Sequence, residues 1–207
     1  MTRIDRVVTH GTFELDGGSW EVDNNIWLIG DGDDVIVVDA AHNAGPIIDA
    51  VGGRNVVAVV CTHGHNDHVT VAPQLGEALD APVLMHPADE VLWRMTHPDK
   101  QFRALEDATT LTVGGVELRV IHTPGHSPGS TCLHAPELSA VFSGDTLFQG
   151  GPGATGRSYS DFPKILASIS EKLGKLPGDN VVYTGHGDTT TIGGELVNYD
   201  EWVARGH

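Results

Sequence analysis

One stretch of this chain restricts the possible folds more than any other. A run of valine and alanine leads directly into residues 61–68 (CTHGHNDH), so a buried strand ends where a cluster of metal-binding side chains begins. On an extended backbone His63 and His65 point the same way, whereas the adjacent Asp67 and His68 point apart unless the chain turns between them. This spacing suits two neighbouring metal ions, the first reached by His63 and His65 and the second by Asp67 and His68. A solvated loop that happens to be rich in histidine is the weaker alternative, because such clusters seldom arise without a metal.

The same pattern recurs at three later points, each an apolar strand that ends in a turn of small residues. The candidate ligands there are His126, Asp145 and His186, and a glycine directly precedes each of them. Glycine permits a sharp exit from a strand and a close approach of the backbone to an ion. Taken singly, each residue would more often be a hydrogen-bonded histidine or a turn aspartate. The prediction therefore rests on their joint occurrence with residues 61–68.

The charge balance argues against a nucleic-acid partner. The chain carries 28 acidic residues against 12 Lys plus Arg, a formal net charge of −16, and it has no basic cluster. Its 207 residues, 40% hydrophobic and 19% charged, suit one globular domain spanning 1–207. The apolar runs are too short for a transmembrane helix and no secretory signal is visible, so we expect a cytoplasmic protein without a membrane partner. Cys61 and Cys132 lie in apolar runs and are expected to be buried, reduced thiols.

The spacing of apolar residues predicts strands and helices in both halves of the chain. Strands are expected over residues 4–13, 25–29, 34–39, 56–61, 82–86, 109–113, 116–121, 131–134, 140–143 and 181–183. Helices are expected over 44–51, 69–79, 88–95, 162–173 and 194–204, and loops over 97–108 and 144–160. Strands combined with helices in each half favour a two-layer sheet core with helices outside.

The ligand pattern as a whole resembles the metallo-β-lactamase-fold hydrolase superfamily in order, spacing and flanking residues. The matching residues are His63-x-His65-x-Asp67-His68, followed by His126, Asp145 and His186. Segments 123–130, 144–148 and 185–193 resemble the small glyoxalase II-like branch of that superfamily. The resemblance implies an α+β fold, an αββα sandwich whose site lies at the strand ends between the sheets.

The same resemblance implies a site with two divalent metal ions. It assigns His63, His65 and His126 to the first ion, Asp67, His68 and His186 to the second, and Asp145 to a bridging position. Asp39 matches an acidic residue that orients the ligand loop through hydrogen bonds, although a simple turn residue explains it equally well from sequence alone. Zinc fits this nitrogen and oxygen ligand set, with iron and manganese as alternatives.

Two departures from the family bear on the substrate. Two-domain glyoxalase II enzymes carry a C-terminal helical domain that holds glutathione, whereas this chain ends shortly after His186, and we expect no such domain. The loop 150–157 is also longer than the family's usual glycine–arginine turn, and Arg157 within it is the candidate contact for an anionic substrate. His42, His122 and Tyr183 lie near ligand loops, but ordinary packing or exposure is the favoured interpretation of each.

The resemblance implies a metal-dependent hydrolase of the glyoxalase II type, which acts on a small-molecule thioester of the hydroxyacyl-thiol type. Divalent ions lower the pKa of bound water to about 7, and Asp67 would aim the resulting nucleophile. A thiolate, whose conjugate thiol has a pKa of about 8.5, leaves without a general acid. The alternatives are a persulfide dioxygenase with one iron, which metal analysis and oxygen consumption would identify, and a lactonase. A β-lactamase is disfavoured by Asp145 and a nuclease by the net charge.

Overall fold

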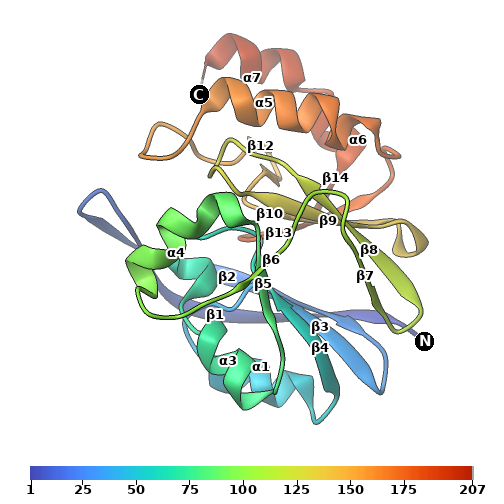
Figure 1. Ribbon diagram of the computed structural model, residues 1–207. Coiled ribbons are helices and arrows are strands. Elements are labelled where there is room, and N and C mark those ends of the chain that lie inside the picture. Colours follow the sequence, from blue (N-terminus) through green and yellow to red (C-terminus); the bar gives the residue numbers. More distant parts are fainter. Residues whose placement is uncertain (207) are drawn as a thin grey trace.

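Two β-sheets packed face to face form the centre of the computed structural model, which describes residues 1–206 (Figure 1). The first sheet follows the sequence order: β1 (Arg3–Leu15), β2 (Gly18–Gly30), β3 (Asp34–Val38), β4 (Asn55–Val60), β5 (Val83–Met85) and β6 (Arg103–Ala104). The second sheet has the order β14 (Thr190–Thr191), β13 (Val181–Thr184), β10 (Ala140–Gly144), β9 (Thr131–Ala135), β8 (Val116–His122) and β7 (Thr110–Val113). A small separate ribbon pairs β11 (Leu147–Phe148) with β12 (Gly151–Pro152).

Helices cover the outer face of each sheet, which confirms the predicted αββα sandwich of the α+β class (Figure 1). Those against the first sheet are α1 (Ala44–Val51), α3 (Ala72–Ala78) and α4 (Glu90–Thr96). Those against the second are α5 (Phe162–Glu171), α6 (Ile192–Leu196) and α7 (Tyr199–Arg205). The remaining turns are α2 (Asn66–Val69) and the 3₁₀ helices η1 (Pro87–Asp89), η2 (Pro136–Leu138) and η3 (Leu173–Lys175). Within residues 1–206, no helix is long and apolar enough to cross a membrane.

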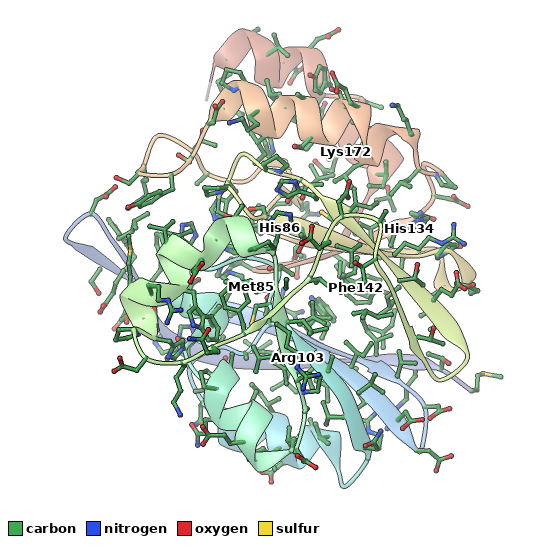
Figure 2. The ribbon with its side chains drawn as sticks, in the orientation of Figure 1. Met85, His86, Arg103, His134, Phe142 and Lys172 are labelled. Carbon is green, nitrogen blue, oxygen red and sulfur yellow. The ribbon has the colours of Figure 1, made fainter. Side chains whose placement is uncertain are left out.

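Side chains that alternate along the strands fill the apolar layers. On β2, Trp27 and Ile29 point between the two sheets, whereas Ile26 and Leu28 join the layer beneath α1 and α3. Phe142 lies between the sheets, fully buried, with its ring centroid 6.4 Å from that of Trp27 (Figure 2). Burial of each such side chain contributes about 1.5–3 kcal/mol. This inner layer therefore fixes how the sheets stack and which of their edges meet.

Two pairs of parallel strands bring the candidate ligand segments to one edge of the sandwich. In the first sheet β3 pairs with β4, and in the second β10 pairs with β13, in parallel in both cases. The carboxyl ends of parallel neighbours lie at the same edge, where ligands commonly bind. Asp39 follows β3, residues 61–68 follow β4, Asp145 follows β10 and His186 follows β13. His126 joins them from the turn between β8 and β9.

Two predicted helices are each divided in the structure. The segment 69–79 contributes to both α2 and α3, because Pro73 lacks an N–H and is accommodated in the first turn of α3. The segment 194–204 contributes to α6 and α7. The Asn198 N–H there donates to the Glu195 carbonyl, a tighter turn that closes α6.

The structure also contains strands that the sequence prediction lacked or placed too short. The first two strands run on beyond their predicted ranges and meet at Asp16 and Gly17, whose φ values of +53° and +75° form a two-residue hairpin turn. The predicted loop 97–108 contains β6, and the predicted loop 144–160 contains the β11–β12 ribbon. Both cysteines are buried free thiols, as expected.

Candidate metal centre

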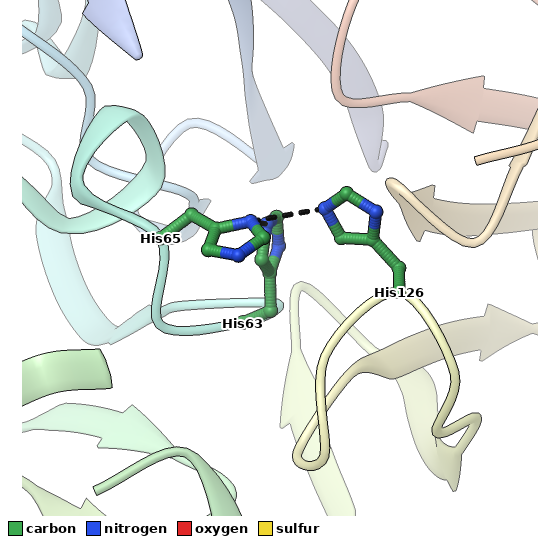
Figure 3. A group of neighbouring side chains, drawn as sticks. All are labelled: His63, His65 and His126. Carbon is green, nitrogen blue, oxygen red and sulfur yellow. Dashed lines mark hydrogen bonds between the residues drawn. The ribbon is translucent and has the colours of Figure 1, made fainter. Parts of the chain in front are cut away.

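Three histidine rings form the first half of the candidate centre (Figure 3). His63 and His65 alternate on the segment that leaves β4, and His126 approaches them from the β8–β9 turn. His65 Nδ1 lies 3.0 Å from His63 Nε2 and 3.0 Å from His126 Nε2. All three residues are buried. One nitrogen of each ring therefore faces a common point.

Asp67, His68 and His186 form the second half. Because α2 begins at Asn66, the chain turns between Asp67 and His68, and both side chains enter the site. His186 Nε2 lies 3.2 Å from His68 Nε2 and 3.3 Å from Asp67 Oδ2. The side chain of His186 is 25% exposed, against 0% for His68, so the second half reaches solvent through His186.

Asp145 lies between the two halves, in the position predicted for a bridging carboxylate. Its Oδ2 is 3.6 Å from His126 Nε2 and 3.3 Å from His186 Nε2, and its Oδ1 is 3.3 Å from His68 Nε2. Gly185 leaves room for this carboxylate, since a Cβ there would lie 2.2 Å from Asp145 Oδ1. The structure thus brings all seven predicted ligand side chains into one cluster. Their role as ligands stays a prediction.

The residues of the cluster fit divalent cations on two counts. Among residues 1–206, Asp67 Oδ1 is buried without a hydrogen-bond partner, and Asp145 Oδ1 makes no well-aligned hydrogen bond although His68 Nε2 lies 3.3 Å away, a state that is costly for a carboxylate. In addition, His65 Nδ1 has two other ring nitrogens at 3.0 Å, and a neutral ring cannot use one nitrogen as both donor and acceptor. A cation among these lone pairs would satisfy both groups. Their nitrogen and oxygen atoms are ligands that zinc, iron and manganese accept.

Burial and charge act differently on the two halves. In the first half, burial lowers the pKa of His65 to about 3 and that of His63 well below its ordinary value, so both rings are neutral and offer lone pairs. In the second half, burial opposes protonation of His186, but Asp145 and Asp67 raise its pKa to about 10. Burial also raises the pKa of Asp67, yet the neighbouring histidines bring it down to about 2. The Asp67 and Asp145 carboxylates are therefore ionised, and their negative charge favours either a proton on His186 or a bound metal ion.

Asp39 orients the ligand loop through hydrogen bonds, as the resemblance implied. Its Oδ1 accepts a hydrogen bond from the Thr62 N–H at 2.8 Å, and its Oδ2 lies 2.9 Å from His68 Nδ1. The second contact fixes the His68 ring so that Nε2 faces the cluster. Asp39 has a φ of +65°, a left-handed conformation that costs a non-glycine residue about 1–3 kcal/mol. Strain of this kind is common where a residue holds a functional site.

A cavity of about 240 Å³ opens onto the cluster. The β1–β2 hairpin contributes Phe13, Trp20 and Val22, called the pocket wall below, and the loop after β12 contributes Ala154 and Arg157. The Arg157 guanidinium stacks 3.7 Å from the centroid of the Trp20 ring. The structure therefore places Arg157 in the lining of this cavity, together with an aromatic wall that the sequence did not indicate. The contact of Arg157 with an anionic substrate stays a prediction. A larger groove of about 430 Å³, between α3 and residues 100–103, is lined by none of the candidate ligands.

Asn24 is a further site residue that the sequence reasoning missed. It is fully buried on β2, and its Nδ2 donates to Asp67 Oδ2 at 3.1 Å. Its Oδ1 lies 2.8 Å from His42 Nε2, so His42 reaches the cluster through Asn24 although the sequence favours packing alone for it. For His122 and Tyr183, the structure shows packing outside the site, which is the interpretation that the sequence favoured. His122 contacts the Pro128 carbonyl outside the cavity, and Tyr183 packs between the sheets.

Comparison with known proteins agrees with this geometry. The family model of the metallo-beta-lactamase superfamily matches residues 20–186. A hydroxyacylglutathione hydrolase from Aeromonas salmonicida is 32% identical over 166 residues, which cover 79% of this chain and 61% of that protein. The crystal structure of TTHA1623 in a di-iron-bound form is 32% identical, with a TM-score of 0.76 over 84% of this chain and 93% of that one. The BLEG-1 B3 metallo-beta-lactamase is 26% identical, with a TM-score of 0.75 over 94% and 99%.

Proposed function

The chain belongs to the metallo-beta-lactamase superfamily, and we propose that it is a metal-dependent hydrolase of the glyoxalase II type that cleaves a thioester of a hydroxyacyl-thiol. The observation that carries this proposal is the Asp145 carboxylate, which lies within 3.6 Å of histidine nitrogens from both halves of the cluster. A carboxylate in this position can bridge two divalent ions, and a pair of neighbouring ions is an established arrangement for hydrolysis. The similarity to a hydroxyacylglutathione hydrolase supports the choice of a thioester.

Two divalent ions are proposed for the centre, with zinc as the first choice and iron or manganese as alternatives. The first ion would be held by His63, His65 and His126, the second by Asp67, His68 and His186, with Asp145 between them. Ions in such a site supply a water nucleophile with a pKa of about 7 and a Lewis acid for the carbonyl oxygen of the substrate. The similarity to a di-iron-bound protein keeps iron among the candidates.

Asp67 is the proposed catalytic carboxylate. Its Oδ2 accepts a hydrogen bond from Asn24, whereas its Oδ1 is buried and has no partner among the described residues. Burial raises the pKa of Asp67, but the neighbouring histidines bring it to about 2, so the carboxylate is ionised at neutral pH. The Oδ1 atom can therefore accept a hydrogen bond from the attacking water and direct this water toward the carbonyl carbon of the substrate.

The cavity favours a small substrate. Its volume of about 240 Å³ lies below the roughly 300–1,000 Å³ that is typical of sites for drug-sized ligands. The pocket wall suits the apolar part of an acyl group, and the guanidinium of Arg157 suits an anionic group. A thiol of pKa about 8.5 is a good leaving group without protonation. A short hydroxyacyl thioester that carries an anionic group is therefore the proposed substrate class.

A substrate panel tests the proposal. Initial rates would be measured on metal-loaded protein with lactoyl-glutathione, a simple acyl thioester, a lactone, a β-lactam and glutathione persulfide, the last with an oxygen electrode. The β-lactam is included because of the similarity to BLEG-1. We expect a thioester to give the highest kcat/KM, with loss of activity on chelation and recovery on adding metal. The Asp145→Ala variant, purified in parallel, controls for a contaminating thioesterase.

The other outcomes are equally informative. Turnover of the lactone or the β-lactam with no thioester cleavage would refute the proposed reaction. Oxygen uptake with the persulfide and no thioester cleavage would establish the oxidoreductase alternative.

A further inference from the structure

Asp89, the last residue of η1, is a buried carboxylate outside the predicted ligand set. Its Oδ2 accepts hydrogen bonds from the Gly64 N–H at 2.8 Å and from Ser127 Oγ at 2.6 Å, and its Oδ1 accepts one from the Gly129 N–H. All three donors are uncharged. Burial raises the pKa of Asp89, and these three hydrogen bonds oppose the rise. Desolvation of a carboxylate is unfavourable, and these three hydrogen bonds compensate for it, so the position of Asp89 depends on the segments that supply the donors.

The donors belong to the two loops that carry the first half of the centre. Gly64 lies between His63 and His65 in the loop after β4. Ser127 directly follows His126 in the β8–β9 turn. One carboxylate therefore joins both loops: it binds the backbone between His63 and His65 and the side chain of the residue that follows His126.

The contact between Asp89 and the loops is tight. A Cβ on Gly129 would lie 2.7 Å from Asp89 Cγ, and a Cβ on Gly64 would lie 3.0 Å from the Asp89 carbonyl oxygen. Glycine at both positions thus lets the backbone approach the carboxylate closely. Neither loop can shift without changing its hydrogen bonds to Asp89.

Asp39 makes the corresponding contacts for the second half. Its donors are Thr62 and the ring of His68, and it shares none of them with Asp89. Asp39 thus contacts His68 of the second half directly, whereas it reaches the first half only through the Thr62 hydroxyl, which lies 3.2 Å from His63 Nδ1. The direct contacts of the two carboxylates are therefore separate. This separation makes the contribution of each carboxylate measurable.

We infer that Asp89 is the positioning residue of the three-histidine half, and that it sets the affinity of this half for a divalent cation independently of the other half. The inference rests on the proposed two-ion centre. Hydrogen-bonded groups behind metal ligands typically change affinity by about 10- to 100-fold when they are removed. Asp89 acts through the backbone of Gly64 and through Ser127, so its loss should displace the three histidines and weaken ion binding without removing any of the ligands.

Cobalt(II), added alone to metal-free protein, provides the test because its visible absorption reports the ligands around it. The variants His126→Ala and His186→Ala serve as references. Each removes one ligand from one half, so the cobalt spectrum of that variant comes mainly from the intact half. Asp89→Asn keeps the size of the side chain but turns an NH₂ group toward one of the donors. We expect Asp89→Asn to weaken cobalt binding about 10- to 100-fold in the three-histidine half, which is the half that His126→Ala disrupts. The matched variant Asp39→Asn should weaken mainly the half that contains His68 and His186, with a smaller effect on the other half through Thr62 and His63.

Ser127→Ala is the milder second variant, in case Asp89→Asn does not fold. It removes one of the three donors and should weaken the same half by about tenfold or less. Wild-type affinity in both halves of Asp89→Asn, or an equal loss in both halves, would overturn the inference, because general destabilisation is not selective. Binding of two cobalt ions with the expected selectivity but no hydrolysis would refute the proposed reaction and leave the role of Asp89 standing. Wild-type protein that binds no cobalt would refute both.

Discussion

Replacing Asn66 with alanine should loosen the pocket wall without removing a candidate ligand. Asn66 Nδ2 donates to the Thr12 carbonyl and its Oδ1 accepts from the Glu14 N–H, both at 2.8 Å. The side-chain amide therefore pairs with the outer edge of β1 on either side of Phe13. The Phe13 ring lines the cavity and lies 5.1 Å from the ring of His65. Asn66 thus ties the ligand loop directly to the wall that would face the substrate.

Two hydrogen bonds set the size of the expected effect. Each contributes about 0.5–1.5 kcal/mol net, and since both are exposed their joint loss should cost about 1–2 kcal/mol. This corresponds to a roughly 5- to 30-fold smaller ratio of molecules whose β1–β2 hairpin packs against the ligand loop (docked) to molecules whose hairpin has moved away from it. The hairpin itself should stay folded, because the β1–β2 ladder and the contact of Asp16 with the Ser158 N–H are kept. We expect KM to rise, by at most this factor, with kcat and metal content nearly unchanged.

Trp20 provides a readout that does not depend on a substrate. It is 40% exposed, whereas the other three tryptophans of the described chain are at most 5% exposed. Acrylamide quenching of fluorescence therefore reports mainly on the hairpin and should increase in Asn66→Ala. Asn55→Ala is the matched control, because Asn55 makes an exposed hydrogen bond to Asp34 at the opposite end of β4. The reasoning fails if Asn66→Ala keeps the wild-type KM and quenching, or if Asn55→Ala changes them equally.

Two further substitutions test the centre itself. Asp145→Ala should reduce kcat by at least about 100-fold, because metal contacts contribute several kcal/mol, while circular dichroism stays native. Near wild-type turnover with full metal content would contradict the bridging role. Gly185→Ala should lower metal content and activity, since its Cβ would lie 2.2 Å from Asp145 Oδ1. Gly32→Ala is the control, because no atom of the described residues lies within 4 Å of the added Cβ. Equal metal loss in both variants would show that the clash is irrelevant.

The ligand cluster and the sandwich were predictable because they follow from local patterns and from a resemblance carried by the ligands. Helix α1 shows how local these rules are. Asn43 caps its first turn by accepting from the Gly45 N–H, and Gly52, with a φ of +64°, ends it at the predicted residue. The ligands follow strand ends in the same manner. Apolar periodicity locates those ends, and parallel pairing places them at one edge.

The pocket wall and Asp89 were not predictable in this way. Phe13, Trp20 and Val22 fit an ordinary amphipathic strand, and Asp16-Gly17 indicates a hairpin but not where its tip packs. That position depends on contacts with segments distant in sequence. Asp89 likewise resembles an ordinary acidic residue near a helix start, and its burial depends on two loops that sequence periodicity cannot bring together.

The candidate ligands and the residues of the pocket wall lie on different parts of the fold, which suggests how substrate preference is determined. Most ligands follow strands whose side chains form the inner core, whereas Arg157 and Trp20 lie on a loop and a hairpin outside it. Such residues can change without disturbing the metal centre, so the wall should set substrate preference and the ligands the reaction. Arg157→Ala should therefore lower kcat/KM about 10- to 100-fold for an anionic thioester, the loss expected for a charged hydrogen bond, and much less for a neutral one. Arg119→Ala, which removes an exposed cation paired with Glu117, should change neither value. Equal losses for both thioesters, or loss of metal from Arg157→Ala, would show that wall and centre are coupled.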